Sequence, residues 1–160
     1  MYNSFTKLGL GTSTIASFGR SLSYIQAKNL FDAALDHNIR TVDTSDTYGS
    51  GDAERLIGKI IKEKRNDFFI ISKAGYSYLS LPEILSPLNQ IGKKILQSIR
   101  VNKCFKKEYI LSSIEKSLKR LNIDYLDAFL LHDPLLVDFS RYSEESCEAL
   151  YLIKKKGLSK

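Results

Sequence analysis

Short apolar runs alternate along the chain with longer segments in which apolar residues recur every three or four positions. The short runs lie at residues 8–12, 39–44, 68–72 and 127–132. Short runs bounded by turn residues predict buried strands, whereas a spacing of three to four predicts amphipathic helices. The resulting order, strand then helix four times, predicts an α/β fold with a parallel sheet that is either open or closed into a barrel.

Helices are predicted behind each strand from their apolar stripes and their capping residues. Ser23 with Gln26 three residues later has the form of a capping box, and Gly157 suits a helix end. Ser143 is predicted to cap the last helix, which should turn Cys147, Leu150 and Tyr151 inward. Four helices are therefore expected, at residues 23–38, 52–65, 106–122 and 143–157.

Residues 76–105 break this alternation and are predicted to form a long irregular loop after the third strand. Pro82 and Pro87 lie in this segment, and a short helix is expected near residues 89–99. A loop of this length after a barrel strand is more often functional than a simple connection. The whole chain, residues 1–160, is otherwise predicted to be one unit.

Composition and charge exclude several classes of protein. Hydrophobic residues make up 43% and charged residues 26%, which is typical of a soluble globular protein, and no run approaches the ~20 apolar residues of a membrane span. The N-terminus lacks a signal-peptide layout, and the two cysteines form no CxxC pair, so we expect a cytoplasmic protein. The net charge of +6 comes from scattered helical lysines and arginines with no nucleic-acid motif, so neither nucleic acid nor membrane is an expected partner.

Four residues with useful chemistry follow apolar strands: Asp43, Tyr48, Lys73 and His132. Each alone has a plain structural explanation, such as a strand-end cap, a packing aromatic, a solvated lysine or a core histidine. The carboxyl ends of parallel strands meet at one edge of the sheet, where α/β barrels build their active sites. The combination therefore favours one shared site.

The chemistry of such a site would be the polarisation of a carbonyl group. A tyrosine hydroxyl is a weak acid, but a nearby ammonium stabilises its phenolate and so favours proton donation. Lys73 could supply that ammonium, and Asp43 could keep it charged. His132 could donate a hydrogen bond to the carbonyl oxygen, while the hydride would have to come from a bound cofactor.

The motifs around these residues resemble those of the aldo-keto reductase family. They are Gly9-Leu10-Gly11-Thr12, the run from Asn38 to Gly49 with Glu54 and Leu56-Ile57-Gly58 beyond it, Ile71-Ser72-Lys73, Ser117 to Leu121, and Asp127 to His132. The resemblance implies the first four units of a (β/α)8 TIM-type barrel that acts on a small carbonyl compound or sugar with NADP or NAD. It implies that Asp43, Tyr48, Lys73 and His132 are catalytic, and that Gly11, Thr12 and Asp43 bind the cofactor. Tyr48 to Glu54 and His132-Asp133-Pro134 are most similar to bacterial aldose and sugar dehydrogenases.

The length of the chain differs from this pattern, because a complete barrel of this type has about 250 residues. We therefore expect residues 1–160 to be half of a barrel, truncated or part of an assembly, with little activity alone. Its strands near Leu8 and Asp127 would be exposed edges open to self-association.

Two other functions remain open on the sequence. One is a non-catalytic regulatory or interaction protein that retains the barrel. The other is a metal-dependent hydrolase that uses Asp43, Asp46, His132 and Asp133. The chain has only two histidines and no His-x-His pair, so we expect no metal site.

Overall fold

The computed structural model describes residues 5–16, 21–76 and 103–160, which form four strands and four α-helices. The strands are β1 (Gly9–Gly11), β2 (Thr41–Asp43), β3 (Phe69–Ala74) and β4 (Ala128–Leu131). They form one parallel sheet in the order β1-β2-β3-β4. The predicted α/β alternation and parallel sheet are confirmed; β3 continues past its predicted end at residue 72 through Lys73 to Ala74.

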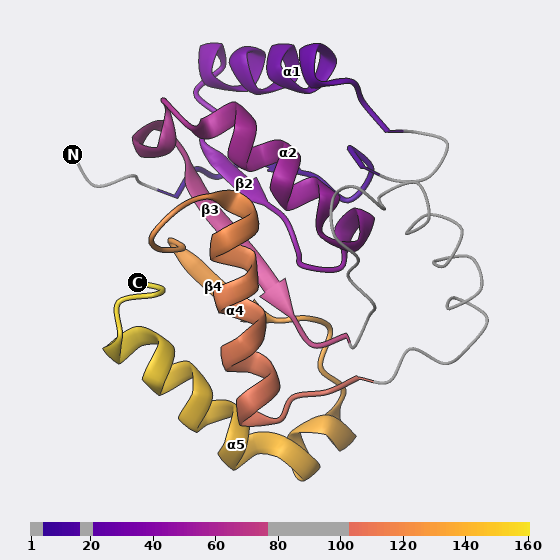
Figure 1. Cartoon of the computed structure of the whole chain (residues 1–160), viewed down its shortest axis with the longest axis vertical. Helices are drawn as coiled ribbons and strands as arrows, with labels where there is room; N and C mark the ends of the chain where they lie inside the picture. Colours follow the sequence, from indigo (N-terminus) through magenta and orange to yellow (C-terminus); the bar gives the residue numbers. More distant parts are fainter. Residues whose placement is uncertain (1–4, 17–20, 77–102) are drawn as a thin grey trace.

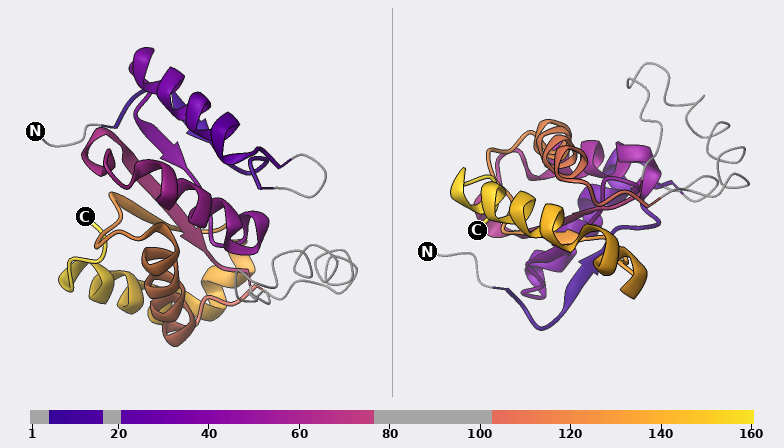
Figure 2. Two further views of the ribbon diagram at one scale, coloured as in Figure 1. Left: turned by 45° about the horizontal axis from the view of Figure 1, so that its top comes forward. Right: turned by 90° about the horizontal axis from the view of Figure 1, so that it is seen from below.

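The helices follow one another across the molecule in chain order (Figure 1). They are α1 (Tyr24–Asp36), α2 (Asp52–Ile61), α4 (Lys107–Leu121) and α5 (Leu136–Lys155), with short 3-10 turns at Tyr48–Gly51 and Arg65–Asp67. In the left view of Figure 2, α1, α2 and α4 lie side by side in front of the strands. No described helix is long and apolar enough to cross a membrane.

Local signals in the sequence set most helix ends. The capping box of α1 is formed as predicted, because Gln26 N–H donates to Ser23 Oγ (3.3 Å) and Ser23 N–H donates to Gln26 Oε1 (2.9 Å). Asn122 ends α4 in the left-handed conformation, with φ of 54°. Helical C-caps adopt this conformation commonly, and asparagine tolerates it better than most residues.

The predicted start of the last helix was wrong, and of its three predicted inward residues only Leu150 packs against the core. Helix α5 begins at Leu136 instead of Ser143, because the Asp138 carboxylate accepts the Leu135 N–H (2.8 Å) and caps the helix earlier. Cys147 is exposed and Tyr151 is 64% exposed, while Leu150 is half-buried against the core. The fully inward positions are Ser146, Ala149 and Ile153. From this face the Ser146 hydroxyl donates a hydrogen bond to the Phe105 carbonyl (3.0 Å).

The two faces of the sheet are covered unequally. Alternate residues of β3 point to opposite faces. Ile70, Ser72 and Ala74 are buried beneath the helices, whereas Phe69, Ile71 and Lys73 on the other face are only half-buried. Among the described residues, only the helix side of this strand is therefore fully covered. Below we call the half-covered side of the sheet the inner face. At the start of β3 the ring of Phe5 packs edge-on against Phe69 on this face (5.8 Å between centroids).

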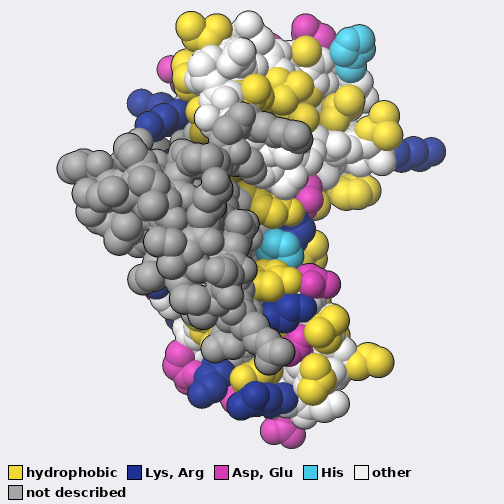
Figure 3. Space-filling view, turned by 90° about the vertical axis from the view of Figure 1, so that its right-hand side faces the viewer, with side chains coloured by type: hydrophobic (Ala, Val, Ile, Leu, Met, Phe, Trp, Pro, Cys, Tyr) yellow, Lys and Arg dark blue, Asp and Glu magenta, His cyan; other side chains and the backbone are white. Residues whose placement is uncertain are grey.

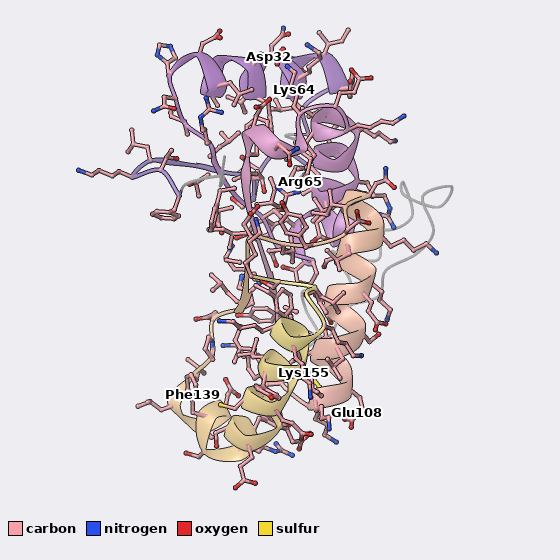
Figure 4. The ribbon with its side chains drawn as sticks, turned by 90° about the vertical axis from the view of Figure 1, so that its left-hand side faces the viewer. Asp32, Lys64, Arg65, Glu108, Phe139 and Lys155 are labelled. Carbon is pink, nitrogen blue, oxygen red and sulfur yellow. The ribbon has the colours of Figure 1, made fainter. Side chains whose placement is uncertain are left out.

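Close contacts between helices build the core on the other side of the sheet. At Gly58 a Cβ would lie 2.4 Å from the Leu121 carbonyl oxygen, so α2 and the end of α4 approach more closely than any side chain permits. An ion pair between Asp32 of α1 and Lys64 joins α1 to the segment after α2 (Figure 4).

Residues near the chain's last position continue the sheet at its β4 side. Leu126 and Ser159 form a parallel bridge, and the buried Asp127 carboxylate contacts Lys160 Nζ (3.1 Å) and Arg65 (2.8 Å). The amino-terminal end of the β4 edge is thus covered. Towards the carboxyl end of β4, Leu130 is 45% exposed, and beside β1 at the other edge of the sheet Leu8 is 68% exposed.

The long loop predicted at 76–105 is described only at its two ends. Tyr76 and Lys103 form an isolated antiparallel bridge, which brings both ends of the loop together beside β4. The short helix predicted near residues 89–99 lies outside the described residues.

We predict that the chain self-associates through the inner face and through the edge of β4 near its carboxyl end. Sedimentation should show a concentration-dependent increase in mass, because apolar strands with open edges pair with other strands. Leu130→Lys places a charge on this face and should shift the distribution towards monomer. Leu136→Lys, at an 88% exposed position on α5, should leave it unchanged. A wild-type chain that stays monomeric at high concentration would contradict the prediction.

Candidate active site

The parallel register of β2 and β3 brings two predicted site residues together. Asp43 pairs with Ile71, so Lys73 lies two residues further along β3 on the same face. Its ammonium reaches the Asp43 carboxylate, with 2.7 Å between Lys73 Nζ and Asp43 Oδ1. The lysine side chain is 15% exposed and the aspartate side chain 40% exposed. The pair therefore lies on the half-covered inner face, at the carboxyl ends of β2 and β3.

Lys73 also contacts the loop that follows β2. Its Nζ donates to the Thr44 carbonyl (2.9 Å) and to the Tyr48 hydroxyl (3.4 Å), and it lies 5.1 Å from the centre of the Tyr48 ring. One ammonium thus touches the carboxylate, the phenol oxygen and the backbone between them. A cation in this position stabilises negative charge on the phenol oxygen.

The Tyr48 loop has a conformation that depends on glycine. Gly49, Ser50 and Gly51 have φ values of 59°, 57° and 92°. A Cβ on Gly49 would lie 2.7 Å from the Ala16 Cβ, and one on Gly51 would lie 2.7 Å from the Arg120 side chain. The Tyr-Gly-x-Gly sequence therefore lets the chain turn sharply after Tyr48 and directly enter α2.

His132, at the end of β4, completes the predicted group. Its ring lies edge-to-face with Tyr48 (5.8 Å between centroids) and with Tyr76 (5.0 Å). Its Nδ1 is 2.8 Å from Ser45 Oγ. Burial, and then the charge of Lys73, lower the pKa of His132 below its usual value, so the neutral ring with one N–H is favoured near neutral pH. The structure thus brings Asp43, Tyr48, Lys73 and His132 together at one end of the sheet.

A second polar cluster borders His132 at the ends of the long loop. The Tyr76 hydroxyl donates to Asp133 Oδ2 (2.7 Å), and Lys103 Nζ lies 3.0 Å from the same oxygen. These two hydrogen bonds lower the pKa of Asp133. Asp133 is therefore held in place by Tyr76 and Lys103. Separately, the described residues contain no group of three His, Cys, Asp or Glu side chains suited to a metal ion.

Buried polar side chains lie on the helix side of the same strand ends. The Glu54 carboxylate is fully buried and accepts hydrogen bonds from Ser72 Oγ and from Arg120 Nε, each at 2.6 Å. Asp46 is also buried, at 1% exposure. Burial, and then the nearby charge of Glu54, raise the pKa of Asp46 to about 7. Asp46 thus changes its charge close to physiological pH.

The predicted cofactor-contact residues form an open shelf beside Asp43. Thr12 is buried, and both its N–H (3.0 Å) and its hydroxyl (2.9 Å) donate to the Asp43 carbonyl. At Gly11 a Cβ would meet no atom within 4 Å. The space beside the Gly11 backbone is therefore open. Figure 3, which shows the side of the molecule that lies at the right in Figure 1, has a histidine side chain next to basic and hydrophobic side chains.

Comparison with known proteins decides the family. The model of the aldo/keto reductase family matches residues 7–160. The chain belongs to the aldo/keto reductase family. It is 31% identical over 158 residues to D-threo-aldose 1-dehydrogenase of a Pseudomonas species, covering 96% of this chain and 47% of that protein.

Two further relatives extend the comparison. A probable voltage-gated potassium channel subunit beta of Arabidopsis thaliana is 28% identical over 98% of this chain and 43% of its own length. The holo form of an aldo-keto reductase from Bacillus halodurans superposes with a TM-score of 0.73 and 25% identity, over 96% of this chain and 43% of that one. The chain therefore spans about half the length of the aldo/keto reductases that it matches.

Several residues around the site were not identified from the sequence as part of it. Ser45 and Tyr76 contact His132, and Arg120 holds Glu54 behind the sheet. Ser45 carries a partial signal, since it lies between Asp43 and Asp46 in the run from Asn38 to Gly49 that resembles the family. Arg120 lies in the segment Ser117 to Leu121 that resembles the family, but no local pattern pairs it with Glu54, which is 66 residues away in the sequence.

We predict that Arg120→Ala destabilises the fold by about 3–5 kcal/mol, because it leaves the buried Glu54 carboxylate without its cation. Glu54→Gln combined with Arg120→Met should recover most of this loss, since no charge is then buried alone. Lys28→Ala, in a surface pair with Asp32 whose side chains are 45% and 34% exposed, should leave the stability close to that of the wild type. Urea unfolding of the four proteins measures these differences; equal losses for Arg120→Ala and Lys28→Ala would contradict them.

We also predict a fall in stability with rising pH that depends on Asp46. Its pKa is raised from 3.8 to about 7 on folding, so between these values the folded chain keeps a proton that the unfolded chain has lost. This contribution is complete below the unfolded pKa and disappears as pH rises through the folded pKa. Asp46→Asn removes the titrating group and should flatten the dependence of unfolding free energy on pH. The exposed Asp36→Asn should keep the wild-type slope; a wild-type slope in Asp46→Asn as well would contradict the assignment.

Proposed function

We propose that this site interconverts a carbonyl group and an alcohol, with Tyr48 as the proton donor. The observation that carries the proposal is the position of the Lys73 ammonium, 2.7 Å from the Asp43 carboxylate and 3.4 Å from the Tyr48 hydroxyl. An ammonium beside a phenol favours transfer of the phenol proton, and the carboxylate keeps the ammonium charged.

Each side chain has a defined part in the reduction. The Tyr48 O–H gives its proton to the carbonyl oxygen, and Lys73 stabilises the phenolate that remains. The neutral His132 ring donates its N–H to the same oxygen and fixes the direction of the carbonyl. In the oxidation of an alcohol the Tyr48 phenolate takes the proton back, and the same contacts operate in reverse.

Gly11, Thr12 and Asp43 are the residues proposed to hold a nicotinamide cofactor, NADP or NAD. A bound nicotinamide would supply or accept the hydride at the carbonyl carbon. Thr12 fixes the backbone of β2 beneath the shelf, and the bare Gly11 backbone leaves it open. The similarity to D-threo-aldose 1-dehydrogenase supports a small carbonyl compound or a sugar as the substrate.

A second candidate function is a regulatory subunit that retains the site without turnover. The similarity to a probable potassium channel beta subunit favours it. The two functions differ in one measurable property. An enzyme oxidises NADPH or NADH in the presence of an aldehyde, whereas a regulatory subunit binds the cofactor and leaves it unchanged.

We predict that Tyr48→Phe lowers kcat for reduction of a generic aldehyde by about 10²–10⁴-fold, the usual range for general acid catalysis. Cofactor affinity should stay nearly unchanged, because the phenol proton is needed only in the transition state. The assay uses the 160-residue chain and a barrel in which these residues replace the matching half of a full-length relative.

Tyr151→Phe, at a 64% exposed position on α5, is the matched control and should keep full activity. Turnover by Tyr48→Phe within a few-fold of the unsubstituted barrel would assign the proton to another group. Cofactor binding with no turnover in either the chain or the barrel would favour the regulatory candidate.

A further inference from the structure

The Ser45 hydroxyl connects the proposed carbonyl-binding histidine to a buried acid. Ser45 is fully buried, and its Oγ lies 2.8 Å from His132 Nδ1 and 3.2 Å from Asp46 Oδ1. Thr47 Oγ1 (3.0 Å) and the Lys73 carbonyl (3.3 Å) are the other oxygens within reach. A hydroxyl has one hydrogen to donate, so what it donates to His132 it cannot donate to Asp46.

The direction of this hydrogen bond determines which nitrogen of His132 carries the proton. If Ser45 donates to Nδ1, the neutral ring carries its hydrogen on Nε2. If Ser45 donates to an ionised Asp46, it must accept from His132, and the hydrogen is then on Nδ1. Only one of these two tautomers offers an Nε2–H to a carbonyl oxygen.

The charge on Asp46 selects between the two directions. An ionised carboxylate can only accept, so it draws the Ser45 hydrogen towards itself. A protonated carboxyl can donate to Ser45 Oγ, which leaves the serine hydrogen for His132 Nδ1. Asp46 is buried beside Glu54, and this environment favours its protonated form at higher pH than is usual for an aspartate.

We propose that Ser45 is a positioning residue that couples the protonation of Asp46 to the tautomer of His132. Protonated Asp46 holds the hydrogen of His132 on Nε2, and ionised Asp46 moves it to Nδ1. The catalytic consequence rests on the proposed function: the Nε2–H needed to orient a carbonyl is lost when Asp46 ionises.

Several charged groups face this relay and belong in its pH dependence. Around Asp46 these are Glu54 of α2 and Arg120 and Tyr109 of α4. Around His132 they are Lys73, Asp43, Asp133 and Lys103. Tyr109 does not ionise in the relevant range, because burial, and then the charge of Asp46, raise its pKa to about 12. Asp46 itself is a buried carboxyl whose pKa is raised to about 7.

The test measures the tautomer directly, on the chain labelled with ¹⁵N-histidine and without cofactor or substrate. Long-range ¹H–¹⁵N spectra distinguish the protonated from the unprotonated ring nitrogen. The chain has only two histidines, and the exposed His37 at the end of α1 is an internal reference. Between about pH 6.5 and 8, where His132 is mainly neutral, the main tautomer should change from Nε2–H to Nδ1–H.

Three variants separate the relay from a general effect of substitution. Ser45→Ala should abolish the pH-dependent change at His132. Asp46→Asn removes the titrating carboxyl, so His132 should keep the same tautomer throughout this pH range. Ser146→Ala, which removes a buried serine hydroxyl that bonds to Phe105, should behave as the wild type.

A wild-type tautomer that is constant over this range, or a wild-type response in Ser45→Ala, would overturn the proposal. Neither result depends on turnover, so failure of the relay is distinct from failure of the proposed function. Conversely, a His132 tautomer that follows Asp46 in the chain, together with no turnover in the completed barrel, would retain the relay and reject the enzymatic role.

Discussion

The parallel register between β2 and β3 is the constraint on which the site depends. It pairs Asp43 with Ile71 and so places Lys73 two residues further along, on the same face. The half-buried ammonium must find acceptors, and the Asp43 carboxylate and the Thr44 carbonyl supply them at 2.7 and 2.9 Å. A shift of one residue would turn Lys73 to the helix side, where Ser72 now meets Glu54. Register and charge thus support the same arrangement.

Much of this arrangement could be predicted from the sequence because it depends on short-range patterns. Apolar runs located the strands, and the residues at their carboxyl ends located Asp43, Lys73 and His132. The start of α5 could not be read in this way, because aspartate and serine both cap helices, and the hydrogen bond from Leu135 N–H to the Asp138 carboxylate starts the helix before Ser143. The Glu54–Arg120 pair was equally inaccessible, since no local pattern joins residues so far apart.

The strand alternation also explains why a polar layer lies directly behind the site. Residues that alternate with Asp43 and Lys73 point to the helices, and at this end of the sheet they include Ser72, joined to Glu54 and Arg120. Such groups are costly to bury unless each has a partner. Their hydrogen bonds tie α2 and α4 to β3 just below the Tyr48 loop. The site therefore lies on a hydrogen-bonded polar layer and not on an apolar core alone.

The half-covered inner face limits the strength of the same interactions. With Asp43 40% exposed, water screens its attraction to Lys73, and an ion pair in such surroundings contributes at most about 1 kcal/mol. Covering this face would lower the local dielectric and strengthen every contact of the ammonium, including its effect on the Tyr48 hydroxyl. The four described strands are therefore sufficient to bring the proposed catalytic side chains together, and a covered inner face would strengthen their electrostatic effect on one another.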